Sequence, residues 1–486
     1  MKSLRRFLIL THRYLGLALG LLVAMWFASG IVMMYAGSMP GLTPQLRLER
    51  LPNLDLTRVR LTPMDAASLA GDGAGPGGPP GRVQLLTVLD RPAYRVDRTT
   101  VFADTGEMLE PVGPALAQTI ASRFMGVPEE RIHFVRTLTS VDQWTLGQRP
   151  MPLHKFRVDD DRGTELYVQP STAEVSTVTT RRERAVAWIG AIPHWLYFAA
   201  LRQDQSLWYQ TVVWTSSAAC VLAVLGLMLG VTQFRKTRPF QLSRAIPYVG
   251  WMRWHYITGV LFGLFTLTWA FSGLLSMEPF AWTNATGLEV DRDVFTGGPP
   301  DLPAFTTLDA ATWDRVLSGR AIKEIEFSRI QDEHYYVVRR AGEQDRVLVD
   351  AKTLEIRREP FSERSLIDRL RTALPDVPIL DSELLTEYDS YYYSRGQQTP
   401  LPVLRVKFGD PAETWVYIDP RMSQITAEIH RLNRVERWLY NGFHSLDFSF
   451  WYDKRPLWDI GMIALLLGGL ISSALGLFMG VKRLIR

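Results

Sequence analysis

Cysteine is almost absent from this chain of 486 residues, which contains only Cys220. A single thiol excludes a disulfide within the chain. It also excludes an iron–sulfur cluster and covalently attached c-type haem, because these need several cysteines or a C-x-x-C-H motif. Any metal-containing cofactor must therefore be held non-covalently by other side chains.

Charged residues are missing from four long apolar stretches, residues 14–36, 205–234, 254–277 and 460–481. About 20 apolar residues cross the hydrocarbon core of a bilayer, and Trp and Tyr stand near the ends of these stretches, as they do at membrane interfaces. The sequence therefore predicts four transmembrane helices in a lipid bilayer. The first stretch is too long for a cleaved signal peptide, and a similar stretch recurs in mid-chain, so we expect it to be retained.

Acidic residues are absent from three short basic segments, residues 1–13, 235–253 and 482–486. The positive-inside rule places all three segments in the cytoplasm. Both termini are then cytoplasmic, and the two long polar segments lie on the other side of the membrane. The basic residues thus describe membrane topology, and we expect no nucleic-acid partner.

The chain reads as one unit used twice. Residues 11–30 match residues 254–273 at an offset of 243, which sets His12 on His255. From about residue 111 the offset is 250, which sets His194 on His444. We expect an internal duplication with parallel repeats, each with a helix, an external domain, a short helix bearing a histidine, and a second helix.

The two external segments have the pattern of α+β domains. Residues 93–109 and 334–356 are each predicted to form two strands around a turn, and residues 154–175 and 404–425 form further strand pairs. Helical periodicity occurs at residues 113–126 and 363–374. Each external segment therefore holds small units in which a helix packs on a few antiparallel strands.

These patterns resemble a known family. The strand–turn–strand pattern around VFADTG (101–106) is similar to the PepSY module, and the helix beginning HRYLG (12–16) resembles those of the PepSY-associated transmembrane family. The resemblance covers nearly the whole chain. It implies a membrane α-helical four-helix bundle in the bacterial inner (cytoplasmic) membrane, with two α+β periplasmic domains of tandem PepSY-like modules. The family includes haem-containing reductases of iron–siderophore complexes, and also many members of unknown activity.

Together, the apolar stretches and the repeat divide the chain into nine parts. These are the N-terminal segment and first membrane helix (1–36), the first periplasmic domain (37–183), an interfacial helix (184–206), the second membrane helix (207–231), a basic cytoplasmic loop (232–253), the third membrane helix (254–277), the second periplasmic domain (278–433), a second interfacial helix (434–456), and the last membrane helix with its tail (457–486).

Four histidines lie in or next to the membrane helices, and parallel repeats relate them by a pseudo-twofold axis along the membrane normal. The axis pairs His12 with His255 near the cytoplasmic face, and His194 with His444 near the external face. Two stacked b-type haems need such pairs as axial iron ligands. We therefore expect two haem b per chain. The alternatives are solvated interfacial histidines for the first pair, and structural or substrate-facing histidines for the second.

Two further groups of residues accompany these histidines. Glycines four and eight residues after the first pair share its helix face and are expected to clear space for a porphyrin: Gly16, Gly20, Gly259 and Gly263. Such glycines also serve as helix–helix contacts in any membrane bundle. Arginines just before the second pair are candidate partners of haem propionates, or else solvated: Arg181, Arg184, Arg431 and Arg434.

The other four histidines lack these features. His154 falls on Leu404 in the repeat, and His133, His334 and His430 stand alone in polar strands or loops. We expect all four to be ordinary surface or structural residues.

The histidine pairs and the family resemblance together predict a di-haem b-type oxidoreductase. It would pass electrons across the membrane and reduce ferric iron in a periplasmic siderophore or similar chelate, with a quinol or a cytoplasmic reductase as electron donor. The sequence identifies no catalytic residue and no particular chelate. The alternative is a haem-free PepSY membrane anchor or sensor that binds peptide or regulates a partner. A metal permease is disfavoured because the helices lack buried carboxylates.

Overall fold

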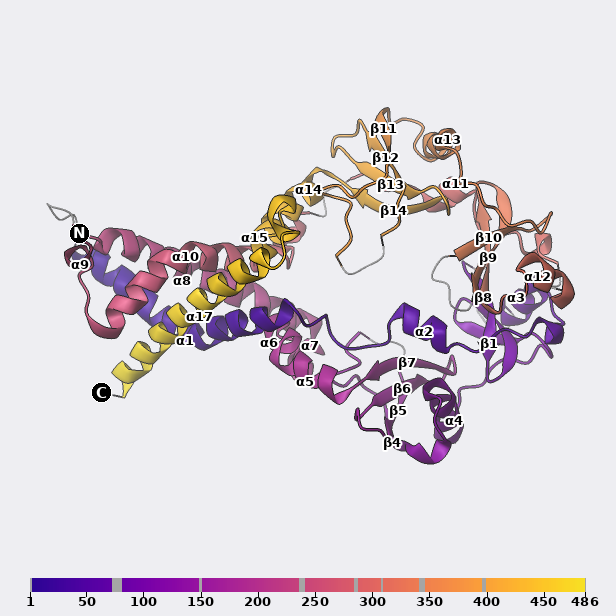
Figure 1. Ribbon diagram of the computed structural model, residues 1–486, viewed down its shortest axis with the longest axis horizontal. Coiled ribbons are helices and arrows are strands. Elements are labelled where there is room, and N and C mark those ends of the chain that lie inside the picture. Colours follow the sequence, from indigo (N-terminus) through magenta and orange to yellow (C-terminus); the bar gives the residue numbers. More distant parts are fainter. Residues whose placement is uncertain are drawn as a thin grey trace. The chain divides into compact units, whose positions relative to one another are not determined.

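The computed structural model describes residues 2–71, 81–147, 151–235, 241–283, 287–306, 309–340, 346–395 and 399–485. The chain forms two compact units (Figure 1). One holds the long helices and comprises Met1–Pro40, Arg182–Ala285 and Arg431–Arg486. The other holds the sheets and comprises Gly41–Arg181 and Thr286–His430. Three bases of the predicted cytoplasmic segments, Lys236, Arg238 and Arg486, lie outside the described residues.

The helical unit contains the four predicted membrane helices, α1 (Lys2–Met33), α8 (Gln205–Gln233), α10 (Gly250–Leu275) and α17 (Leu457–Leu484). Each is long and apolar enough to cross a bilayer. The chain is therefore a membrane protein. Because α1 begins at Lys2 and α10 at Gly250, the first two histidines lie inside their helices, in the third and second turns.

The four helices pack in a ring. α1 contacts α17 and α8, and α10 contacts the same two helices. Close approach is possible where α17 carries glycine, since Gly468 faces the ring of Phe262 and Gly469 faces the ring of Phe27. The remaining buried core side chains are Val23, Ala219, Trp269, Trp458, Met462 and Leu466.

The segments expected as single interfacial helices are broken into short pieces. The first contains α5 (Arg181–Ile189), α6 (Ala191–Trp195) and α7 (Ala199–Arg202). The breaks have a local cause, because Gly190 has non-helical angles (φ −113°, ψ −96°) and Leu196 is left-handed (φ 52°). The second contains α14 (Arg431–Arg437), a π-helical turn η5 (Trp438–Gly442), α15 (Phe443–Ser445) and α16 (Ser449–Tyr452).

The sheet-containing unit is built on one six-stranded antiparallel sheet with the order β10-β9-β8-β1-β2-β3. Its strands are β1 (Val83–Val88), β2 (Arg91–Val96), β3 (Thr99–Phe102), β8 (Ile322–Ile330), β9 (Glu333–Arg340) and β10 (Arg346–Asp350). The two long segments therefore share a sheet, and the expectation of two separate domains is wrong. Pairing β1 with β8 satisfies the backbone groups that each three-stranded sheet alone would expose at its edge.

One face of this sheet carries the larger apolar core. Tyr94 and Tyr336 are fully buried there, below α3 (Pro63–Gly71) and α12 (Ala310–Val316). Edge-on aromatic contacts join Tyr336 to Trp313 and Phe305. The core draws on both long segments, which is why they form one unit.

Two four-stranded antiparallel sheets complete the unit, with the orders β4-β5-β6-β7 and β11-β12-β13-β14. Their strands are β4 (Ile132–Leu138), β5 (Leu153–Val158), β6 (Glu165–Gln169), β7 (Glu174–Thr179), β11 (Ile379–Leu385), β12 (Val403–Phe408), β13 (Trp415–Asp419) and β14 (Gln424–Ile429). Helix α4 (Pro114–Met125) packs into the core of the first, and α13 (Glu363–Ala373) into that of the second. The predicted α+β character is confirmed.

The two four-stranded sheets have the same irregularity. The register shifts between Tyr167 and Val168 in the first sheet, and between Tyr417 and Ile418 in the second. Short elements complete the description: α2 (Pro44–Arg50), η1 (Leu56–Arg58), η2 (Glu129–Arg131), α9 (Leu242–Ala245), η3 (Pro279–Ala281), α11 (Arg292–Thr296) and η4 (Leu302–Ala304).

Candidate functional site

The helical unit brings the four membrane histidines together as two pairs. In the first pair, His12 of α1 and His255 of α10 have ring centroids 6.3 Å apart, with 37° between the ring planes. In the second pair, His194 of α6 and His444 of α15 have ring centroids 6.0 Å apart, with 75° between the planes. The pairing is the one that the repeat predicts.

Backbone carbonyls of neighbouring helices orient the first pair. Nδ1 of His12 lies 3.2 Å from the carbonyl oxygen of Leu222 in α8. Nδ1 of His255 lies 3.0 Å from the carbonyl oxygen of Ser472 in α17. A carbonyl only accepts hydrogen bonds, so Nδ1 carries the proton in both rings. Nε2 is then the nitrogen with a free lone pair, which a metal ion requires.

Serine hydroxyls orient the second pair. Oγ of Ser29 lies 3.1 Å from Nδ1 of His194, and Oγ of Ser272 lies 2.9 Å from Nδ1 of His444. Each hydroxyl also reaches a carbonyl one turn back in its helix, at 2.7 Å for Ser29 and 3.1 Å for Ser272. If each serine donates to that carbonyl, it accepts from the imidazole, and Nε2 is again the free nitrogen.

The ring nitrogens that take part in hydrogen bonds distinguish these histidines from a structural one. The side-chain contacts of both pairs are made through Nδ1, whereas His154 uses both ring nitrogens. Its Nδ1 lies 2.9 Å from Thr137 Oγ1, and its Nε2 lies 3.0 Å from the carbonyl oxygen of Val112. The structural role predicted for His154 fits these contacts.

Burial keeps the second pair uncharged. Loss of solvation lowers the pKa of His194 to about 4. Loss of solvation, together with the nearby His194, lowers the pKa of His444 to about 3. Both imidazoles are therefore neutral at physiological pH, which is the form that ligates metals.

The two pairs lie far apart along the helices. Ser29 follows His12 by 17 residues (29 − 12), and Ser272 follows His255 by the same number (272 − 255). At about 1.5 Å per residue, each separation is about 25 Å. The hydrocarbon core of a bilayer is about 30 Å thick, so this separation is close to the full thickness of that core.

A glycine lies against each of the four imidazoles, and the contact is tight only in the first pair. A Cβ atom at Gly226 or Gly476 would lie 3.0 Å from Cε1 of the first-pair histidine that it faces. A Cβ atom at Gly30 or Gly273 would lie 3.6 or 3.8 Å from Cε1 of the second-pair histidine that it faces. Each of these glycines recurs at the repeat offset, and Gly226 and Gly476 are predictable from the sequence because they lie toward the same ends of their helices as the first pair.

The glycines that were expected to clear space for a porphyrin face neighbouring side chains instead. The nearest atoms to an added Cβ belong to Leu222 at Gly16, Leu477 at Gly20, Ser472 at Gly259 and Leu227 at Gly263, at 3.7, 3.3, 3.7 and 3.0 Å. These are the contacts of small-residue helix packing. Porphyrin clearance at these positions stays a prediction.

The four predicted arginines stand in the first turns of α5 and α14, but their exposure differs. Arg181 and Arg431 are exposed, Arg184 is half-buried, and Arg434 is 8% exposed. The structure therefore makes Arg434 the best placed of the four for a buried anionic group.

A buried ion pair lies near the second pair and was not predicted. Arg437 donates from Nη2 to the backbone oxygen of Asp447 at 2.9 Å, and the same nitrogen lies 3.5 Å from the Asp447 carboxylate. Both side chains are less than a tenth exposed. In the other half the equivalent positions are Ala187 and Tyr197. The ion pair is not repeated, so a comparison of the two halves could not predict it.

The two imidazoles of each pair would hold a haem iron if one were bound between them. Their ring centroids lie 6.3 Å apart in the first pair and 6.0 Å apart in the second, which leaves space for one metal ion. A hydrogen bond from the other ring nitrogen is the usual support of a ligating histidine. The described residues contain no group of three or more His, Cys, Asp or Glu side chains suited to a metal ion. Haem takes only axial ligands from the protein.

The fold is that of a multi-pass membrane protein with an α+β unit. The family model of the PepSY-associated TM region matches residues 9–312, which is more than half of the chain. The chain belongs to this family, as the sequence resemblance predicted. A comparison with curated proteins finds no match.

Proposed function

We propose that this protein is an inner-membrane di-haem b-type oxidoreductase that reduces ferric iron in a siderophore or similar chelate in the periplasm. The electron comes from a quinol or from a cytoplasmic reductase. In this proposal the chain is an internal duplication with parallel repeats, and its α+β segments are tandem PepSY-like modules that present a surface to the chelate. Each chain holds two haem b molecules, without covalent attachment.

The observation that carries the proposal is the free Nε2 atom of each membrane histidine. Four imidazoles, from four different helices, have Nδ1 hydrogen-bonded to the protein, which leaves Nε2 as the ring nitrogen for a metal ion. Intramembrane ionisable side chains without a ligand are costly, and such residues commonly mark functional sites. Two facing pairs, each hydrogen-bonded through Nδ1 to equivalent partners in the two halves, account for the arrangement better than four unrelated structural histidines do.

The chain's own residues have defined tasks in this proposal. The carbonyl oxygens of Leu222 and Ser472 fix the tautomer and the ring orientation of the first pair. Ser29 and Ser272 do the same for the second pair. Haem iron with two axial imidazoles exchanges single electrons rather than binding oxygen. The aliphatic and aromatic side chains of the bundle exclude water from this path.

The direction of transfer rests on the basic segments. The positive-inside rule places the first pair near the cytoplasm and the second pair near the periplasm. The second pair belongs to the short helices that connect the bundle to the sheet-containing segments. In the proposal, an electron that reaches this pair is therefore on the periplasmic side of the membrane.

Absorption spectroscopy of the full chain in detergent tests the proposal. We expect reduced b-type bands after dithionite and two haems per chain by pyridine haemochrome. The double variant His12→Ala/His255→Ala should lose one haem and keep the other. His133→Ala removes an exposed histidine of β4 and is the matched control, with unchanged haem content.

The same experiment distinguishes the oxidoreductase from the alternative function, a haem-free anchor or sensor. A colourless protein, prepared with haem supplied during expression, would contradict the oxidoreductase proposal and favour the haem-free anchor or sensor. If haem binds, the next measurement is oxidation of the dithionite-reduced protein by a ferric siderophore, followed by the loss of the reduced bands. Bands that persist with every ferric chelate tested would contradict the assigned substrate class.

A further inference from the structure

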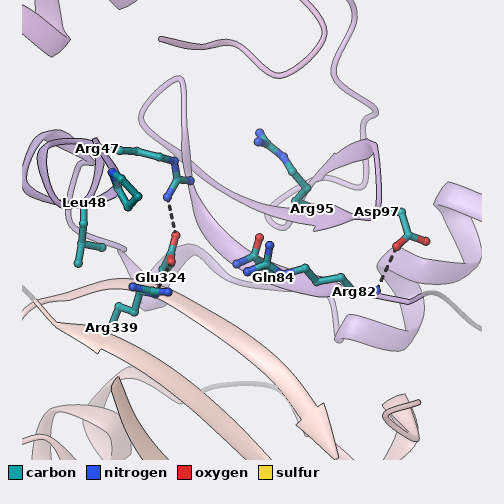
Figure 2. A pocket seen from close by; sticks show the side chains of 9 residues that line it. Arg47, Leu48, Arg82, Gln84, Arg95, Asp97, Glu324 and Arg339 are labelled. Carbon is teal, nitrogen blue, oxygen red and sulfur yellow. Dashed lines mark hydrogen bonds and ion pairs between the residues drawn. The ribbon is translucent and has the colours of Figure 1, made fainter. Parts of the chain in front are cut away.

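A polar cavity lies within the sheet-containing unit, away from the histidines. Its volume is about 380 Å³, and Arg47, Arg82, Arg95 and Arg339 line it together with Glu324, Asp97 and Gln84. Figure 2 shows Gln84 between Arg82 and Glu324, with Arg47 of α2 next to Glu324 and joined to it by an ion pair. The volume is at the small end of ligand pockets, but the lining is polar where most such pockets are apolar.

The cavity stands where the two halves of the six-stranded sheet meet. Gln84 of β1 is directly opposite Glu326 of β8 in the strand register, and its amide Nε2 donates to Oε2 of Glu326 at 3.3 Å. Arg82 and Arg95 come from the first half of the chain, and Glu324 and Arg339 come from the second. Neither half alone contains this site.

Carboxylates hold the arginine side chains in place but accept hydrogen bonds from only some of the guanidinium N–H groups. Glu324 is 6% exposed and lies 3.0 Å from Nη1 of Arg47 and 2.9 Å from Nε of Arg339. Arg82 binds Glu326 through Nε and Nη2. Among the described residues, no hydrogen bond reaches Nη1 of Arg82 or either terminal nitrogen of Arg339. Guanidinium donors from both halves therefore remain available in one cavity.

The acids of the lining restrict what the cavity accepts. Glu324 and Asp97 carry negative charge and only accept hydrogen bonds when ionised. They repel a compact, multiply charged anion at the centre of the cavity, but they bind a hydroxyl group. Arginine forks match the planar carboxylate. A complementary ligand carries at least two carboxylates for the arginines and a hydroxyl between them.

We propose that this cavity binds a small hydroxy-polycarboxylate, as the free acid anion or as its ferric chelate. Carboxylates bind the free donors of Arg82 and Arg339, and the hydroxyl donates to Glu324 or Asp97. A network that only joined the two halves would need neither the free guanidinium nitrogens nor a cavity of this size. The site is independent of the histidines, so it stands whether or not the protein holds haem.

Isothermal titration of the full chain in detergent, at low ionic strength, tests the proposal with four probes. Citrate is the hydroxy-tricarboxylate, tricarballylate is the same tricarboxylate without the hydroxyl, inorganic phosphate is the compact anion, and ferric citrate is the chelate. We expect citrate to bind about tenfold more tightly than tricarballylate or phosphate, the size of effect that one hydrogen bond to a charged group gives. Tighter binding of ferric citrate than of citrate identifies the chelate as the ligand, and equal binding identifies the free anion.

Two variants and one control locate the site. Arg339→Gln removes the donors of the second half, and Arg82→Gln removes those of the first; Arg82 is 56% exposed, so this variant folds even if the other does not. Each is expected to weaken citrate binding about tenfold. Arg364→Gln removes an equal charge from the exposed face of α13 and should change nothing. The proposal is overturned if citrate does not bind, if phosphate binds as tightly, or if Arg82→Gln leaves citrate affinity unchanged.

Discussion

Cε1 of His255 lies 3.0 Å from the position that a Cβ atom at Gly476 would occupy. Even alanine at this position therefore shifts the imidazole from its place in the first pair. We expect Gly476→Ala to weaken haem retention at that pair about tenfold, the lower end of the effect of disturbing the support of a metal ligand. Pyridine haemochrome of the protein after extensive washing in detergent measures the loss.

Gly259→Ala is the matched control for this change. A Cβ atom there meets Oγ of Ser472 at 3.7 Å, an ordinary contact distance. Unchanged haem content is expected, because the residue packs against α17 and not against an imidazole. Loss of haem in Gly259→Ala, with retention in Gly476→Ala, would favour the original expectation that Gly259 borders a porphyrin.

Ser272→Ala removes the hydroxyl that lies 2.9 Å from Nδ1 of His444 and that accepts its hydrogen bond in the proposed tautomer. An imidazole without this acceptor is a weaker base, so it would stabilise ferric iron relative to ferrous iron less than the native ligand does. We expect a higher midpoint potential for one of the two haems, measured by redox titration of the b-type bands. Ser276→Ala is the control, since that hydroxyl donates to the carbonyl of Gly273 and touches no histidine. Equal potentials in both variants would contradict a role of Ser272 in positioning the ligand.

The membrane helices and the histidine pairs were predictable because their signals are local or repeated. A charge-free stretch of sufficient length has few alternatives to a membrane helix. The offset that sets His12 on His255 also predicted that the two rings meet, as they do at 6.3 Å. The hydrogen-bond partner of His12 could not be predicted from the sequence. It is the backbone carbonyl of Leu222, and every residue has a backbone carbonyl.

The joining of the two sheet segments was not predictable in the same way. β1 and β8 each have the sequence pattern of a strand in a small separate domain. Neither sequence indicates which strand pairs with its free edge. The pairing joins residues more than two hundred positions apart, such as Gln84 and Glu326. The arginine cavity depends on that pairing, so it could not be predicted from the sequence either.

A disulfide between the central strands tests the shared sheet. Directly opposite residues on antiparallel strands have Cα atoms about 4.5–5.5 Å apart, within the range of a disulfide. We expect Gln84→Cys/Glu326→Cys, in a Cys220→Ser background, to cross-link under mild oxidation. Mass spectrometry of a tryptic digest would show the linked peptides. Each single variant should keep a free thiol, and two free thiols in the double variant would contradict the pairing of β1 with β8.

Glu174 should make the sheet-containing unit sensitive to acid. Burial alone raises the pKa of this carboxyl, but Arg95 and Arg47 outweigh burial and lower it below its ordinary value of 4.5. The carboxylate therefore stabilises the folded state above about pH 4.5, and the stabilisation is lost as the pH falls from there through the folded-state pKa. We expect Glu174→Gln to destabilise the unit by about 1–3 kcal/mol at neutral pH.

Hydrogen exchange of the β6 and β7 amides, measured from about pH 3 to pH 7, separates this effect from general acid sensitivity. After correction for the intrinsic exchange rate, protection in the native chain should fall below about pH 4.5 more steeply than in Glu174→Gln, whose neutral amide has no proton to gain. Glu110→Gln, at an exposed position, should follow the native profile. A Glu174→Gln profile as steep as the native one would mean that other carboxylates control acid unfolding, and that the bonds of Glu174 to Arg47 and Arg95 contribute little to holding α2 on β7.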